Sequence, residues 1–114
     1  MNKNINERIQ TLFELYQNKK DETEDYAKSI IDEFPNHPAS YKILSFILLN
    51  SARFSESLPI LKKLLKMTPK DPEIYYLLGI GLQGLNQYEE AINNYKKVIK
   101  LKPDFILAYS NLAN

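Results

Sequence analysis

Residues 72–105 read PEIYYLLGIGLQGLNQYEEAINNYKKVIKLKPDF, and this stretch decides the fold. Apolar side chains recur at helical spacing in its first half, which starts at Pro72, and again in its second half. Gly84 is expected to end the first helix, because glycine readily adopts the left-handed conformation that follows many helices. Asn86 and Glu89 have the spacing of a capping box for the second helix. The stretch therefore predicts two antiparallel helices joined by a short turn.

The pattern of this stretch recurs along the chain every 34 residues. The in-phase positions share a residue type: proline, tyrosine, leucine or a small side chain. They are Pro35, Pro69 and Pro103; Tyr41, Tyr75 and Tyr109; Leu44, Leu78 and Leu112; and Ser45, Gly79 and Ala113. One helical hairpin cannot bury its own apolar face, so this period predicts stacked helix pairs. We expect an all-α chain in which replacing Gly79 or Ala91 by leucine unfolds the array through overpacking.

These residues resemble the tetratricopeptide repeat family, whose units combine an aromatic, Leu-Gly, a small residue, a second aromatic and a closing proline. Residues 72–105 match best, 38–71 form a second match, and 106–114 resemble the first helix of a partial fourth unit. Residues 4–37 share the closing proline but have Glu7 and Gln10 where an aromatic and a leucine are expected, so we interpret them as a degenerate first repeat. The resemblance implies one domain, 1–114, built as a right-handed superhelical α-solenoid of about seven helices.

The resemblance also implies a binding groove. First helices of such arrays line a concave face that holds a peptide or partner segment. The family's groove positions fall here on Ala39, Lys42, Phe46, Leu49 and Asn50, then on Glu73, Tyr76, Ile80 and Gln83, and finally on Leu107, Ser110 and Asn114. Phe46, Leu49, Tyr76 and Ile80 would form an apolar stripe, which usually marks an interaction site. We expect a protein–protein interaction scaffold in which Phe46 and Tyr76 anchor the partner; the alternative is that the first helix or a second copy of the chain covers the stripe.

Two subfamily signatures are absent. The basic clamp that recognises acidic C-terminal tails would use Lys42, but Phe46, Leu77 and Leu107 occupy its other positions. The asparagine ladder of arrays that precede protein-glycosylating transferases would use Asn111 alone. A hydrophobic partner is therefore favoured over an acidic tail.

The composition argues against catalysis and against a metal or cofactor site. The 114 residues contain no cysteine, one histidine and a net charge of +1. That histidine, His37, lies between two prolines and is expected to be a solvated turn residue. Because no set of His, Cys and carboxylates converges, we expect no enzyme, no metal and no cofactor. The near-neutral charge and the lack of a long apolar run argue against nucleic acid and membrane partners, and we expect a cytoplasmic protein.

Two further features leave alternatives open. Lys62, Lys63 and Lys66 recur as Lys96, Lys97 and Lys100, which predicts a lysine ladder on successive second helices. Such a ladder is either a solvated face or a site for anions. The last helix is expected to expose Ile106, Leu112 and one side of Tyr109. The chain would then either form a homo-oligomer through this uncapped helix or serve as the N-terminal, non-catalytic arm of a larger transferase.

Overall fold

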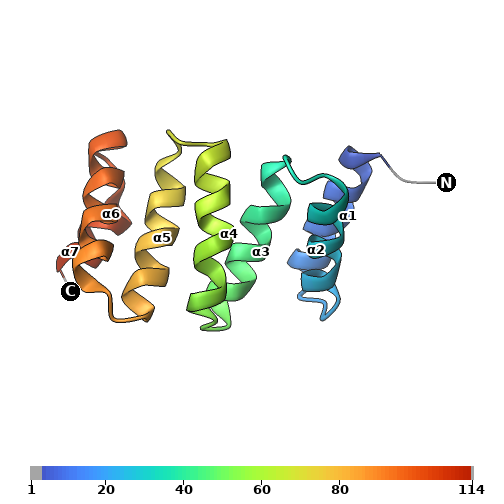
Figure 1. Cartoon of the computed structure of the whole chain (residues 1–114), viewed down its shortest axis with the longest axis horizontal. Coiled ribbons are helices and arrows are strands. Elements are labelled where there is room, and N and C mark those ends of the chain that lie inside the picture. Colours follow the sequence, from blue (N-terminus) through green and yellow to red (C-terminus); the bar gives the residue numbers. More distant parts are fainter. Residues whose placement is uncertain (1–3, 114) are drawn as a thin grey trace.

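The computed structural model describes residues 4–113, and it describes side chains as far as Leu112. These residues form seven helices and no strand (Figure 1). The helices are α1 (Ile5–Gln17), α2 (Thr23–Glu33), α3 (Pro38–Asn50), α4 (Phe54–Met67), α5 (Pro72–Gly84), α6 (Tyr88–Leu101) and α7 (Ile106–Ala113). The expected all-α solenoid of about seven helices is confirmed.

The helices stack in chain order along the longest dimension of the molecule, which measures 50 × 25 × 22 Å (Figure 1). Each helix packs against the next one in the sequence. First helices of adjacent units also contact one another, α1 with α3 and α3 with α5, whereas the second helices α2, α4 and α6 are held further apart within the described residues. The first helices therefore line the inner side of the curve, and the second helices form the outer side.

A repeated tyrosine joins each unit to the turn before it. The hydroxyl of Tyr41 donates to the Pro35 carbonyl at 2.7 Å. The same bond recurs between Tyr75 and Pro69 at 3.2 Å and between Tyr109 and Pro103 at 2.8 Å. Each of these prolines follows a second helix, and its carbonyl has no partner within that helix, so the tyrosine satisfies that oxygen.

Side-chain volumes are matched between the two helices of each unit. A Cβ atom added at Gly79 would overlap the Tyr95 ring. The same positions in the second unit hold Ser45 and Leu61, which are both fully buried. Close packing therefore requires a small residue on one helix wherever the other helix carries a large one.

The first unit follows the same rule, but here the first helix carries the large residue and the second helix carries the small one. The eighth residue of α1 is Leu12, which occupies the place of Ser45 and Gly79 in α3 and α5. Ala27 stands on α2 where the later units have Leu61 and Tyr95. Leu12 and Ala27 are both fully buried in the same core cluster.

The first unit is also one residue shorter between its left-handed turn residue and its closing proline. The left-handed turn residues are Lys19, Ala52 and Asn86, so the first spacing is one residue less than the second. The fourth and seventh residues of α1 are therefore Arg8 and Thr11, and the 34-residue alignment that placed Glu7 and Gln10 there was wrong.

Two details of the α5–α6 turn also differ from expectation. Gly84 is the last residue of α5 and has no positive φ; the left-handed residue is Asn86, at φ 62°. Gly84 lacks a side chain because a Cβ there would overlap the ring of Phe54. The N-cap of α6 is Gln87, which makes no side-chain capping bond, so the expected capping box is wrong. Asn86 instead accepts a hydrogen bond from the Tyr88 hydroxyl at 2.7 Å.

An arginine fork joins the first two units. The Arg53 guanidinium donates to both carboxylate oxygens of Glu24 on α2, at 2.6 and 2.9 Å. It also donates to Glu56 at 2.7 and 2.9 Å. Hydrogen bonds from Arg53, and then from Lys28, lower the pKa of Glu24 to about 2. Bidentate pairs of this kind fix the orientation of one helix pair relative to the next.

Candidate peptide-binding groove

The inner face presents rows of side chains, each row crossing three or four first helices. Counted along each helix, the fifth residues are Ile9, Lys42, Tyr76 and Ser110, the ninth are Phe13, Phe46 and Ile80, and the twelfth are Tyr16, Leu49 and Gln83. Seven of these ten side chains are apolar or aromatic. The inner face is therefore largely hydrophobic from α1 to α5.

Near α1, the inner face contains one aromatic ring that packs against another, Phe46, and one exposed ring, Phe13. Phe46 is half-buried, and its ring packs on that of Tyr16 with centroids 6.2 Å apart. Phe13 occupies the ninth position of α1 and is 45 % exposed. The first helix therefore covers part of the predicted stripe through Tyr16 and adds an exposed ring to it through Phe13.

Tyr76 stands at the centre of an aromatic group at the α7 side. Its ring lies 5.1 Å from Phe105 and 5.9 Å from Tyr95 between centroids. Asn111 on α7 donates to the hydroxyl of Tyr95 at 3.2 Å, and that hydroxyl donates to Gln83 at 2.7 Å. Burial raises the pKa of Tyr95, so the hydroxyl stays protonated and keeps this bond to Gln83. Gln83 is thus committed to the packing of the unit.

Lys42 is the charged member of the fifth row. Its ammonium group pairs with Glu73 at 3.1 Å and with Asp71 at 3.7 Å, and all three side chains are partly exposed. These two carboxylates already neutralise the lysine. The pair also connects α3 to the start of α5, so two predicted groove residues, Lys42 and Glu73, contact each other.

The remaining predicted positions divide by burial. Leu49 and Ile80 are half-buried against the core of the second and third units. Ala39 is half-buried, whereas Leu107 and Ser110 are exposed. Asn114 lies outside the described residues.

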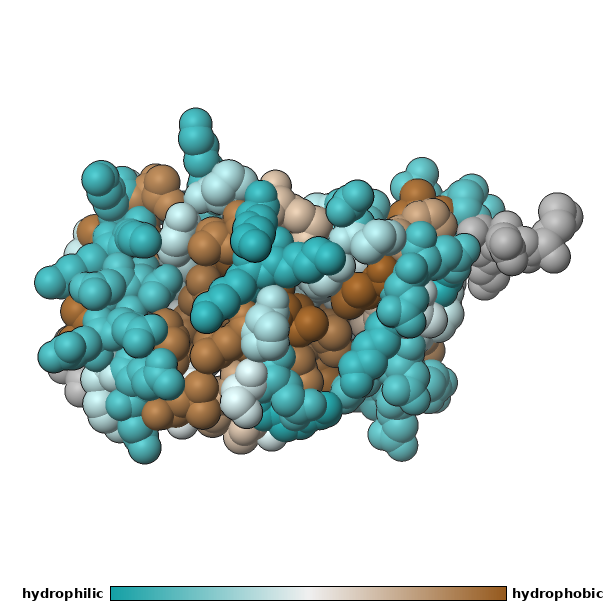
Figure 2. All heavy atoms as spheres, viewed as in Figure 1, coloured by the Kyte–Doolittle hydropathy of each residue, from teal (hydrophilic) through white to brown (hydrophobic). Residues whose placement is uncertain are grey.

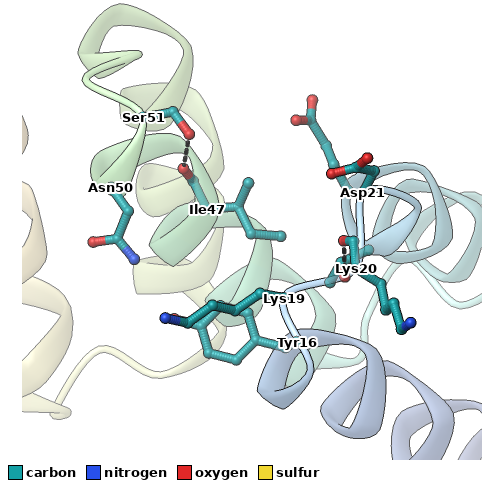
Figure 3. Close-up of a pocket in the computed structure, with 9 residues that line it drawn as sticks. Tyr16, Lys19, Lys20, Asp21, Ile47, Asn50 and Ser51 are labelled. Atoms are coloured by element: carbon teal, nitrogen blue, oxygen red, sulfur yellow. Dashed lines mark hydrogen bonds between the residues drawn. The ribbon is translucent and has the colours of Figure 1, made fainter.

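The groove continues into a hollow of about 340 Å³ at the turn between α1 and α2. Its walls include Tyr16, Lys19, Ile47 and Asn50 (Figure 3). The side chains of Lys19 and Asn50 extend into this space, while Lys20 points away from Asn50. Asn50, an exposed member of the predicted groove, therefore sits at one end of it beside a cationic group.

Three residues of this face were missed by alignment at 34 residues: Ile9, Phe13 and Tyr16. The apolar residues of the first helix can be read from the sequence, but their register relative to the later units cannot. The sequence signal for the correct register was the eighth residue of each first helix. Leu12 faces Ala27 in the first unit, and this pair satisfies the same packing rule as Gly79 facing Tyr95 in the third.

No group of His, Cys and carboxylates in the described residues could hold a metal ion. His37 is half-buried rather than solvated, and its Nδ1 atom is buried with no hydrogen-bond partner among the described atoms. Its carbonyl accepts a bond from Ser40, so the residue serves as the N-cap of α3. No described helix is both long and apolar enough to span a bilayer.

Residues 84–114 match the family model described as TPR repeat. This match, together with the stack of seven helices, supports a tetratricopeptide repeat assignment. Among solved structures, MamA from Desulfovibrio magneticus RS-1 has a TM-score of 0.82 and 25 % identity over 92 % of this chain. The match spans 60 % of the MamA chain. No curated protein matches the chain significantly.

Two other solved structures share the fold. The first repeat domain of Spaghetti (RPAP3), bound to an HSP90 peptide, has a TM-score of 0.86 and 20 % identity over 93 % of this chain and 85 % of its own. A mutant O-GlcNAc transferase from Thermobaculum terrenum has a TM-score of 0.83 and 18 % identity over 98 % of this chain but only 22 % of its own. At these identities the likeness concerns the arrangement of the helices.

Proposed function

We propose that the chain is a protein-interaction scaffold that binds an apolar segment of a partner along α1, α3 and α5. The observation that carries this proposal is the ninth-position row of Phe13, Phe46 and Ile80. It crosses three helices and includes a ring that is 45 % exposed. A continuous apolar row with one free aromatic ring is typical of the centre of a binding site.

The charges of the inner face support an apolar segment over an acidic one. Lys42 is already paired with Asp71 and Glu73, so binding a carboxylate there would require breaking an existing ion pair. The related fold of Spaghetti holds an HSP90 peptide, SRMEEVD. We propose that this chain also captures a peptide, with aromatic side chains making the main contacts.

The experiment uses peptides selected from a random library on the immobilised chain, with affinity measured by calorimetry. Phe13→Ser should weaken binding about tenfold, which corresponds to about 1.4 kcal/mol. Tyr88→Ser is the control, because Tyr88 is an exposed aromatic residue (56 % against 45 % for Phe13) on the second helix α6. Equal affinity of the parent chain and Phe13→Ser would exclude the groove.

A second candidate, self-association, is supported by exposed apolar side chains on α6 and α7. Phe54 and Leu58 on α4 pack against Gly84 and Gly81 of the following first helix. Their counterparts one unit later, Tyr88 and Ile92, are 56 % and 39 % exposed. Further exposed apolar side chains lie on the following helix, α7: Ile106, Leu107 and Tyr109.

We propose that a second copy of the chain covers this face. Sedimentation velocity over a range of concentrations should then show a dimer that Ile106→Ser weakens. A strict monomer at the highest concentration would exclude the proposal without affecting the groove.

A further inference from the structure

The outer face of the second and third units is cationic over the later turns of α4 and α6, whereas the acids of these helices, Glu56, Glu89 and Glu90, lie in their first turns. No aspartate or glutamate occurs from Ser57 to Lys70 or from Ala91 to Pro103. Each of these stretches carries four lysines. Hydrophilic side chains project over α4 and α6 on this face, with hydrophobic atoms between the helices (Figure 2). The chain as a whole is nearly neutral, so the charge is concentrated here and balanced by the acids around α2.

The lysines of this face fall into two groups. Lys63 lies 5.6 Å from the centre of the Tyr41 ring, and Lys97 lies 5.4 Å from that of Tyr75. These two cations cover the tyrosines that join the units, which is a packing role. Lys62 and Lys66, and their counterparts Lys96 and Lys100, are exposed and take part in no ion pair or ring contact among the described residues.

A hollow accompanies the free lysines of α4. It has a volume of about 570 Å³ and is lined by Asn36, Pro59, Lys62, Lys63, Lys66 and Met67. The exposed part of its lining is mostly apolar, through Pro59, Met67 and the aliphatic stems of the lysines. A solvated lysine face needs no apolar hollow beneath it. A site for a segment that carries both carboxylates and an apolar side chain needs both features.

The chemistry of the face selects among anionic partners. Lysine ammonium groups are point charges, and the forked guanidinium that favours phosphate recognition is missing from this face. The rings of Tyr41 and Tyr75 are covered by lysines, so they are not free to stack on bases. A nucleic acid is therefore disfavoured, and a carboxylate-bearing protein segment fits best.

We propose that this outer face is a second binding site, separate from the groove, for an acidic segment of a partner protein. Lys62 and Lys66 bind its carboxylates, and the hollow at Pro59 and Met67 accepts one apolar side chain. Lys96 and Lys100 extend the cationic surface by one unit. The site lies on second helices, whereas the groove lies on first helices, so both can be occupied together.

The test uses fluorescence anisotropy with a labelled peptide of aspartate and glutamate around one central leucine. The double variant Lys62→Glu/Lys66→Glu should weaken binding about tenfold, and Lys96→Glu/Lys100→Glu should have a smaller effect. Affinity should fall as salt rises, because such exposed pairs are screened beyond about 10 Å at 0.1 M. A peptide with serine in place of the leucine should bind more weakly.

Two controls make the outcome decisive. Lys19→Glu/Lys20→Glu changes the net charge equally at the other end of the molecule and should leave affinity unchanged. Phe13→Ser removes a groove side chain and should also leave it unchanged, so failure of this site and failure of the groove are distinguishable. Equal weakening by the Lys19/Lys20 variant would show a net-charge effect and overturn the proposal. So would binding to duplex DNA or phosphatidylserine vesicles without binding to the peptide.

Discussion

The first and third units solve the same packing problem in opposite ways. In the third unit a glycine on α5 receives a tyrosine from α6, whereas in the first unit a leucine on α1 meets an alanine on α2. The third unit uses Tyr75 to bind the preceding carbonyl. The first unit has Arg8 at that position, and its guanidinium binds Ser29 and Glu33 instead. The comparison shows that the summed volume of a helix pair is maintained while the residues that supply it change.

The largest effect is expected for Gly79→Leu. A Cβ alone would overlap the Tyr95 ring, and the rest of a leucine side chain has no free space in a buried site. A folded domain of this kind has about 5–15 kcal/mol of stability, so we expect loss of the folded state. Circular dichroism during thermal unfolding checks this. An unchanged melting temperature would contradict the volume rule.

A compensating pair of substitutions tests whether the side-chain volumes at positions 79 and 95 are coupled. Gly79→Ser/Tyr95→Leu recreates the buried pair of the second unit, Ser45 and Leu61. The double variant should be more stable than Gly79→Ser alone, although it loses the hydrogen bonds of the Tyr95 hydroxyl. A double-mutant cycle in urea measures the coupling, and a coupling energy near zero would show that the two positions are independent.

The first unit should respond in the opposite direction. Leu12→Ala removes a fully buried leucine and should cost about 2–5 kcal/mol through the cavity that it leaves. Adding Ala27→Leu should recover part of that loss, because the volume returns from the other helix. Urea unfolding of the three variants tests this, and a further loss in the double variant would show that the first unit does not follow the rule.

A smaller effect concerns the junction between the first two units and depends on pH. The pKa of Glu24 is lowered in the folded chain to about 2 by Arg53 and Lys28. A lowered folded pKa means that the stabilisation is present above the unfolded value of 4.5 and is lost as the pH falls from there toward 2. Because both side chains are partly exposed and the pair is screened by solvent, we expect at most about 1 kcal/mol.

The matched variant for this junction is Glu24→Gln. It should lower stability at pH 7 and flatten the decline between pH 4.5 and pH 2, measured by urea unfolding at each pH. A decline of the same steepness in Glu24→Gln and in the parent chain would assign the acid sensitivity to other carboxyl groups.

The smallest effect is expected in the turns. Lys19, Ala52 and Asn86 have φ values of 53°, 57° and 62°. Asparagine tolerates this region better than alanine does. Ala52→Asn should therefore raise the free energy of unfolding by a few tenths of a kcal/mol to about 1 kcal/mol, whereas Asn86→Ala should lower it similarly. Denaturant midpoints measure both, and identical midpoints would contradict the account of the turns.

The sequence predicted the solenoid because the second and third units repeat residue types in phase. Pro72, Gly79 and Tyr95 each carry a local signal that needs no knowledge of the partner helix. The first unit could not be aligned in the same way. Its register depends on the compensation between Leu12 and Ala27, which is a property of two helices together.

The groove was partly predictable for the same reason. Phe46 and Tyr76 lie on helices with clear signatures, so their positions on the first helices α3 and α5 were predictable. Phe13 and Tyr16 depend on the register of α1, and the ion pair of Lys42 with Glu73 depends on how the units stack. Sequence spacing alone does not specify such contacts between units.

The central claim is that the inner face formed by α1, α3 and α5 is where a partner's apolar segment binds. The most direct measurement is amide chemical-shift mapping of the isotope-labelled chain with a peptide selected from a random library. We predict that the largest shifts occur around Phe13, Phe46 and Ile80 and that the outer helices α2, α4 and α6 change little. The largest shifts on α4 and α6, with none around Phe13, would contradict the claim.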